Sequence, residues 1–350
     1  MKKLLFLTAL ATTALAGCTS DEQNEAAKQS QPSKIVFNTP IVNGNTRAVY
    51  GEQGTTYDTG EQFHVYAVWT KGNFETWAAG TPYMDVDVTY KNGTPKGWWE
   101  PETDYYWPKE GYLSFAAYSP VAASNNATKI EYGANGLSIT GFTVSETGKQ
   151  YDLMYSDRTC DKQESTGGTT YSGVDINFKH ALSSIVFKAK TKDAYSGTTI
   201  RIKKIYIYGI KNQGNFKENI KDQKVRENED SKTTGWENLS GNVNVSNPYV
   251  AFNETAGEEV TNSEKIFEHN AIIALPQDLG DDAKVTVEYT IQSSGSTAIE
   301  QTKTVDLKTL TAEWKMGYRY IYNITISLSK IYFSPEVEAW KDAPMSSIDL

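Results

Sequence analysis

A cysteine near the start of the chain lies in a sequence context that directs covalent chemistry to its sulfur. Lys2 and Lys3 give a positive start, residues 4–15 form an apolar run too short to span a bilayer, and small residues precede Cys18. This spacing is typical of a lipobox, in which the sulfur receives a diacylglyceryl group before cleavage. We predict that Cys18 is lipidated and begins the mature chain; the alternative is an ordinary secretory signal with a chance cysteine.

Other side chains with catalytic potential are few and isolated. Asp85 with Asp87, and Glu336 with Glu338, are pairs at i, i+2 that a strand would point to one face. Two carboxylates can hydrolyse glycosides, but alternating acids are typical of the solvated face of a sheet. His180 has no second histidine or reactive cysteine nearby, so we expect it to make structural hydrogen bonds. With no Gly-rich phosphate loop either, we predict that the chain is not an enzyme.

Composition excludes several further classes of function. The only thiol after Cys18 is Cys160, which rules out an internal disulfide, and His64, His180 and His269 are too scattered for a metal site. The formal net charge of -9 without any basic block argues against nucleic acid as a partner. We therefore expect no metal and no cofactor. No second apolar run is long enough to cross a bilayer, so we expect the whole chain beyond the anchor to be exported.

The secondary-structure signal has a period of two. Apolar residues alternate with polar ones in 318–328, in 284–291 and in 63–69, as in strands with one buried face. Clusters of Gly, Asn, Asp, Pro and Thr separate these runs and indicate turns. We predict an all-β fold of two β-sandwiches in tandem. Further expected strands are 34–41, 84–90, 112–118, 136–142, 176–178, 184–190, 202–210, 271–275, 302–307 and 331–339.

The chain divides into predicted regions by composition. The Gly, Ser and Thr cluster at 165–173 separates two groups of strands, and the polar residues after Cys18 indicate a tether. A long polar stretch at 212–247 is expected to be a surface insertion. The predicted regions are a signal peptide (1–17), a tether with a first strand (18–47), an N-terminal sandwich (48–170) and a C-terminal sandwich (171–350) that ends in an apolar segment (331–340).

Two motifs resemble one known family. Residues 178–187 read FKHALSSIVF, which resembles the F-x-H-x-L strand of fimbrillin-like proteins, the subunits of type V pili. Residues 314–322, with Trp314, Gly317 and three alternating tyrosines, resemble the aromatic penultimate strand of that family. The resemblance covers nearly the whole chain, and it implies transthyretin-like sandwich domains and a fimbrial or adhesive role.

The resemblance also implies a route of maturation. Such precursors reach the outer membrane as lipoproteins, and an arginine-specific protease then cuts in a loop after the first strand. Arg47 and Ala48 flank the expected cut, in a Gly- and Asn-rich stretch. The cut would release a removable strand containing Ile35, Phe37 and Ile41. The implied locations are the outer membrane, the cell surface and the fimbrium, and the implied partners are the protease and other pilin subunits.

The consequence of such a cut follows from elementary sheet chemistry. Removal of a strand leaves unpaired backbone groups and an apolar trench, which another chain can fill by adding a strand. The best donor is the C-terminal segment, in which Pro335 must avoid a ladder position that needs an amide proton. Donor and trench lie at opposite ends of the chain, so the contact propagates as an open filament. The donor residues of one parity are Ile331, Phe333, Val337 and Ala339.

An alternative function remains open at this point. A lipid-anchored sandwich could bind a glycan or host ligand without polymerising, and Trp98, Trp99, Tyr105, Tyr106 and Trp107 could form an exposed aromatic platform for it. Aromatic residues in such turns more often fold back over the core. Whether the subunit would belong to the stalk, the tip or the anchor of a fibre also stays open, because an arginine site and an apolar C-terminal segment are both present.

Overall fold

The computed structural model describes residues 34–38, 40–42, 45–46, 61–71, 80–91, 98–133, 135–162, 173–219 and 233–340. Within them the chain is almost entirely β-structure, as predicted, with one 3₁₀ turn and one short helix. No helix in this part of the chain has the length and apolar character of a membrane span. The elements are β1 (Ile41–Val42), β2 (Asn45–Thr46), β3 (Gln62–Thr70), β4 (Thr81–Lys91), β5 (Trp98–Pro101), β6 (Tyr112–Ser119), the 3₁₀ helix Val121–Asn126, β7 (Lys129–Gly133), β8 (Gly136–Thr143), β9 (Met154–Ser156), β10 (Thr159–Lys162), β11 (Asn177–His180), β12 (Ser183–Thr191), β13 (Thr198–Tyr208), β14 (Gln213–Lys217), β15 (Gly235–Ser240), β16 (Tyr249–Val260), β17 (Lys265–Ala274), β18 (Gln277–Asp278), β19 (Lys284–Ser293), β20 (Ile299–Asp306), α2 (Leu307–Leu310), β21 (Glu313–Trp314), β22 (Tyr318–Ile326) and β23 (Ile331–Ala339).

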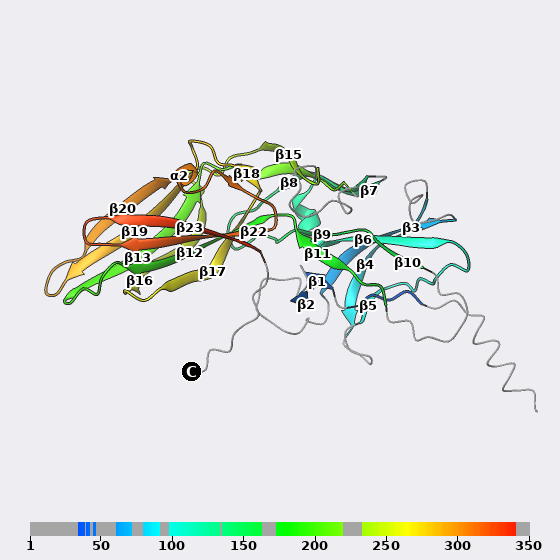
Figure 1. The fold of residues 1–350 in the computed structure, drawn as a ribbon, viewed down its shortest axis with the longest axis horizontal. Coiled ribbons are helices and arrows are strands. Elements are labelled where there is room, and N and C mark those ends of the chain that lie inside the picture. Colours follow the sequence, from blue (N-terminus) through cyan, green and yellow to red (C-terminus); the bar gives the residue numbers. More distant parts are fainter. Residues whose placement is uncertain are drawn as a thin grey trace, which may run out of the picture.

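The strands form two lobes (Figure 1). The N-terminal lobe is built on a nine-stranded sheet in the order β2-β1-β11-β9-β6-β3-β4-β5, with β10 paired to β6. The C-terminal lobe packs the sheet β17-β12-β22-β23 against the sheet β16-β13-β19-β20. The predicted pair of sandwiches is thus present, and two clusters of buried apolar side chains form the cores.

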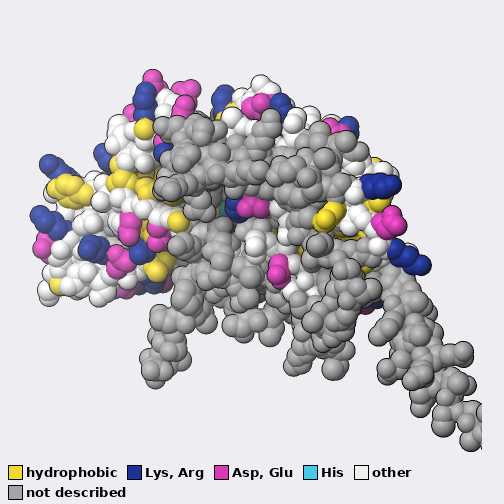
Figure 2. Space-filling model, turned by 45° about the vertical axis from the view of Figure 1, so that its right-hand side comes forward, with side chains coloured by type: hydrophobic (Ala, Val, Ile, Leu, Met, Phe, Trp, Pro, Cys, Tyr) yellow, Lys and Arg dark blue, Asp and Glu magenta, His cyan; other side chains and the backbone are white. Residues whose placement is uncertain are grey.

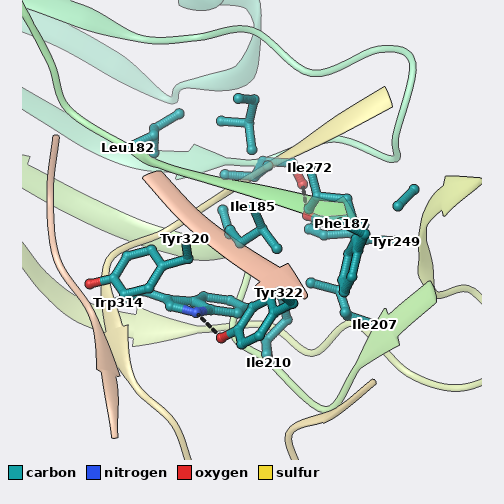
Figure 3. Close-up of a cluster of buried hydrophobic side chains, with 14 of the residues drawn as sticks. Leu182, Ile185, Phe187, Ile207, Ile210, Tyr249, Ile272, Trp314, Tyr320 and Tyr322 are labelled. Carbon is teal, nitrogen blue, oxygen red and sulfur yellow. Dashed lines mark hydrogen bonds between the residues drawn. The ribbon is translucent and has the colours of Figure 1, made fainter. Parts of the chain in front are cut away.

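Alternation explains the C-terminal core. In β22 the side chains of Tyr320, Tyr322, Ile324 and Ile326 are buried, as the period of two predicts. The hydroxyl oxygen of Tyr322 accepts a hydrogen bond of 3.0 Å from the indole Nε1 of Trp314, and the close-up shows both rings within the apolar cluster (Figure 3). This bond satisfies two polar groups that burial has removed from water.

Strand pairing crosses residue 170, where the sequence favours a domain boundary. Residues 174–180 pair within the N-terminal sheet, and the chain enters the C-terminal sheet at Ser183. The stretch 212–247, predicted to be a surface insertion, instead contributes β14 and β15 to a sheet with β8 and β7. The prediction is wrong for β14, because Phe216 is fully buried on it and anchors the strand to the core.

A buried carboxyl group follows β14. Glu218 accepts a hydrogen bond of 2.9 Å from the backbone N–H of Leu137 through Oε2. Burial is the main cause that raises the pKa of Glu218 to about 7, and the hydrogen bond from Leu137 opposes it. Because the charged form lacks its solvent shell, this group links the stability of the β8–β14 junction to pH.

Candidate functional site

The leading segment, residues 34–38 and 40–42, closes a gap between two edges of the N-terminal sheet. On one side it pairs antiparallel with β5, where Phe37 N–H donates to Trp99 O at 2.8 Å and Trp99 N–H donates to Phe37 O at 3.0 Å. On the other side it runs parallel to residues 174–178, through Asn38 N–H to Val174 O and Val174 N–H to Val36 O, both 2.9 Å. We call the space that the leading segment fills the slot.

The slot is apolar inside. Ile35 and Phe37 have no exposed surface, and Val42 is 1% exposed. The ring of Phe37 makes edge-to-face contacts with Phe63 and Phe115, at centroid distances of 6.0 and 5.7 Å. Such pairs add to the stabilisation from burial. The segment therefore completes the N-terminal core.

The alternation of inward-facing side chains expected for the leading segment is interrupted along its length. Phe37 pairs with Val174 and Val42 pairs with Phe178, so five residues of the segment run beside four residues of its neighbour. One extra residue in a ladder is a bulge, and it reverses which side chains face inward. The buried side chain at the end is thus Val42, and the side chain of Ile41, which the sequence predicted as an anchor, lies outside the described residues.

Charged groups flank one end of the slot. Lys34 Nζ lies 2.7 Å from a carboxylate oxygen of Glu100 and 2.7 Å from one of Asp104. The hydrogen bond to Asp104, and then that to Glu100, raise the pKa of Lys34 above its ordinary value. At the other side Asn38 Nδ2 donates to Asp175 Oδ1 at 2.7 Å. The slot therefore has two carboxylates at its entrance, and both pair with the ammonium group of Lys34.

The predicted processing residues lie just beyond this site in the sequence. β2 ends at Thr46 and pairs antiparallel with β1, one residue before Arg47. Arg47, Ala48 and the predicted lipidation site Cys18 lie outside the described residues. Their roles stay predictions.

The C-terminal segment forms a strand at the edge of its sheet. β23 pairs antiparallel with β22 along its whole length, and no other described strand pairs with its second edge. Ile331 and Phe333 are half-buried, whereas Ala339 is exposed and Val337 is 48% exposed. Pro335 lies opposite Tyr322 on this edge strand, where proline is tolerated.

One aromatic contact anchors the end of β23. Trp340 is buried and stacks on His180 of β11, with ring centroids 3.8 Å apart and planes inclined by 5°. The Nδ1 atom of His180 lies 2.7 Å from Asp152 Oδ2, which agrees with the expected structural role of this histidine. The stack could not be anticipated from the sequence, because it joins residues that are far apart in the chain.

The carboxylate pairs do not form a catalytic pocket. Asp85 and Asp87 each lie within 2.8 Å of a ring nitrogen of His64 across β3 and β4, and both carboxylate side chains are exposed. Glu336 and Glu338 lie exposed on β23. In the part of the chain that the structure describes, no three His, Cys, Asp or Glu residues are placed to hold a metal ion.

Two of the five aromatic residues considered for a glycan site lie in the core. Trp99 is fully buried in contact with Phe63, and Trp107 is buried in contact with Phe115. Tyr106 is exposed, and Trp98 and Tyr105 are half-buried, so the five rings do not form one exposed platform. Figure 2 shows Lys/Arg and Asp/Glu side chains interspersed on the visible described surface, with no patch of one sign.

Comparison with known proteins found similar solved structures and one matching family model. The chain is similar to a crystal structure of a fimbrial protein from Bacteroides vulgatus, with a TM-score of 0.55 and 17% identity over 80% of this chain and 93% of that one. It is also similar to a candidate cell adhesion protein from Bacteroides uniformis, with a TM-score of 0.47 and 16% identity over 89% and 99% of the chains. No curated protein matches. A family model described as fimbrillin-like matches residues 46–340, and the chain therefore belongs to the fimbrillin-like family.

Proposed function

We propose that this chain is a subunit of a cell-surface fimbrium that matures by losing its leading segment and polymerises by strand exchange. The precursor is anchored to the outer membrane by a lipid on Cys18, and an arginine-specific protease cuts it between Arg47 and Ala48. Family membership supports the role of pilus subunit, and it agrees with the prediction that the chain is structural and not an enzyme.

One observation carries the proposal, which is that the leading segment is inserted between two sheet edges. Its removal would free the backbone groups of Tyr105, Trp99 and Val174 that now make five hydrogen bonds with it. It would also uncover the apolar floor beneath Ile35, Phe37 and Val42. An open pair of edges above an apolar floor is a site for strand addition.

The contacts of the leading segment supply a large gross stabilisation. Three buried anchors at about 1.5 to 3 kcal/mol each and five hydrogen bonds near 1 kcal/mol each give on the order of 10 kcal/mol before the cost of association. The same estimate applies to any strand that reproduces these contacts. After the cut these contacts alone hold the leading segment, so a strand that reproduces them can displace it.

The strand β23 is the proposed donor. It lies at an edge, its apolar side chains Ile331 and Phe333 are only half-buried, and Val337 is exposed. Transfer into an apolar slot would bury them fully, which stabilises the transferred state. A chain that can both be cut and donate a strand is suited to the stalk of a fibre.

Digestion of the purified precursor with an arginine-specific protease tests the proposal. We expect release of the fragment that ends at Arg47, followed by oligomers of high mass that resist denaturant. Arg47→Gln should prevent the cut, and Phe333→Asp should permit the cut but prevent oligomer growth. A cleanly cut product that stays monomeric would contradict the proposal and favour the non-polymerising ligand-binding alternative.

A further inference from the structure

The two ends of the chain carry nearly the same short sequence. Residues 33–38 read SKIVFN and residues 329–334 read SKIYFS, so Ser, Lys, Ile and Phe recur at the same spacing. In the first copy, Ile35 and Phe37 are the side chains that fill the slot, and Lys34 binds the two carboxylates beside it. The second copy begins the strand β23.

The number of residues between the phenylalanine of the repeat and the next apolar anchor differs by one between the two segments. The leading segment has five steps from Phe37 to Val42, whereas β23 has four steps from Phe333 to Val337. The neighbouring edge also has four steps, from Val174 to Phe178, and its buried residues alternate without interruption. A strand with the spacing of β23 would therefore pair with this edge without the bulge.

We propose that the slot of one copy takes β23 of a second copy of the same chain in one register. In this register, Lys330 replaces Lys34, Ile331 replaces Ile35, Phe333 replaces Phe37 and Val337 replaces Val42. The inference rests on the proposed strand exchange and adds to it the partner, the alignment and the residues that select it.

The backbone hydrogen bonds support this register. The amide donors of the leading segment in the slot are Ile35, Phe37 and Asn38. Their counterparts are Ile331, Phe333 and Ser334, all of which carry an N–H group. Pro335 follows Phe333 by two residues, so its nitrogen would face the β5 side of the slot. At that point the donor strand has passed Trp98, where β5 begins, so no hydrogen bond of the described strand β5 is lost.

Other registers are worse for stated reasons. A shift by one residue would turn Ile331 and Phe333 away from the core, because side chains alternate between the two faces. If β23 were shifted by two residues toward the end of the slot that holds Lys34, Pro335 would take the position of Phe37, whose N–H group donates to Trp99 O. Compared with these registers, the proposed one combines apolar anchors inside with an N–H group at each donor position of the leading segment.

Charge complementarity acts at the entrance of the slot. Lys330 is exposed on the monomer, and in the slot it would reach Glu100 and Asp104 as Lys34 does. At the other end, continuing the regular pairing places Glu338 on the solvent-facing side, beside Lys179 of β11, whose ammonium group already pairs with Asp157. A donor without the cation would leave two carboxylates facing each other at the entrance, which disfavours unrelated strands.

Competition with synthetic peptides tests the register on the full-length chain. The Phe333→Asp variant, cut after Arg47, has an intact slot and a disabled donor, so it can be titrated with a labelled peptide of residues 329–340. We expect this peptide to displace the leading segment. The Val337→Asp peptide should bind about thirtyfold more weakly or worse, because it buries a charge beside Phe178. The matched Glu338→Val peptide should bind like the wild type.

The outcomes separate this inference from the proposed function. If Glu338→Val binds more tightly and Val337→Asp binds unchanged, then position 338 faces the core and the register is wrong, although strand exchange stands. If no peptide binds the cut chain, strand exchange itself fails. The Lys330→Glu peptide should lose about fivefold in affinity and regain it on a slot that carries Glu100→Lys and Asp104→Lys. A loss that the reversed slot does not restore would overturn the selecting role of Lys330.

Discussion

Truncation of one side chain in the leading segment should destabilise the precursor but not the processed subunit. Phe37 has no exposed surface and contacts Phe63 and Phe115 through its ring. Replacement of a buried Phe by Ala removes transfer energy and leaves a cavity, at a cost of about 3 to 5 kcal/mol. Phe37→Ala should therefore lower the free energy of unfolding of the precursor by this amount, measured by urea denaturation.

The processed chain supplies the control for this measurement. Once the fragment that ends at Arg47 has been removed, position 37 is no longer part of the molecule, so the two processed proteins should unfold identically. Val36→Ala on the same segment is the matched variant, and because Val36 is only half-buried it should cost less than about 1 kcal/mol. A precursor that tolerates Phe37→Ala as well as Val36→Ala would refute the assignment of Phe37 to the N-terminal core.

Three further changes test other contacts. Trp340→Ala removes the stack on His180 and should lower the free energy of unfolding by about 3 kcal/mol, measured by chemical denaturation. Because the end of β23 is then unanchored, oligomers should grow faster after cleavage. Slower growth would count against β23 as the donor. Burial raises the pKa of Glu218 to about 7, so between pH 4.5 and 7 the folded state keeps a proton that the unfolded state has lost, and the stability of the protein falls as the pH rises. Glu218→Gln should flatten this dependence and raise the free energy of unfolding by about 3 kcal/mol above pH 7. A variant whose stability follows the same pH profile as the wild type would contradict this reasoning. Tyr322→Phe leaves the indole N–H of Trp314 without its acceptor and should cost about 1 to 3 kcal/mol in thermal unfolding, whereas an unchanged transition would show that this bond is not needed.

The strands with one buried face could be predicted from the sequence because their signal is local. The alternation in 318–328 and 284–291 corresponds to β22 and β19, and the apolar residues at Ile35 and Phe37 are buried as expected. Of the aromatic residues at 98–107, Trp99 and Trp107 are buried for the general reason that aromatic side chains dominate cores. In these cases neighbouring residues contain the information that decides the outcome.

The features that the sequence did not predict depend on distant partners. β14 has one large apolar residue, Phe216, and its position is decided by pairing with β8, which lies far earlier in the chain. The bulge that buries Val42 depends on the register with Phe178. The stack of Trp340 on His180 likewise has no counterpart in the local pattern. Each required the tertiary arrangement.

The larger apolar cluster has a mechanical consequence. It includes Leu137 and Phe142 of the β8 sheet together with Tyr322 and Ile326 of the C-terminal sheet. A hinge between the lobes would have to open this packed interior to water, so the subunit should behave as a stiff rod. Curvature of any fibre assembled from it would then arise at the joints between successive copies.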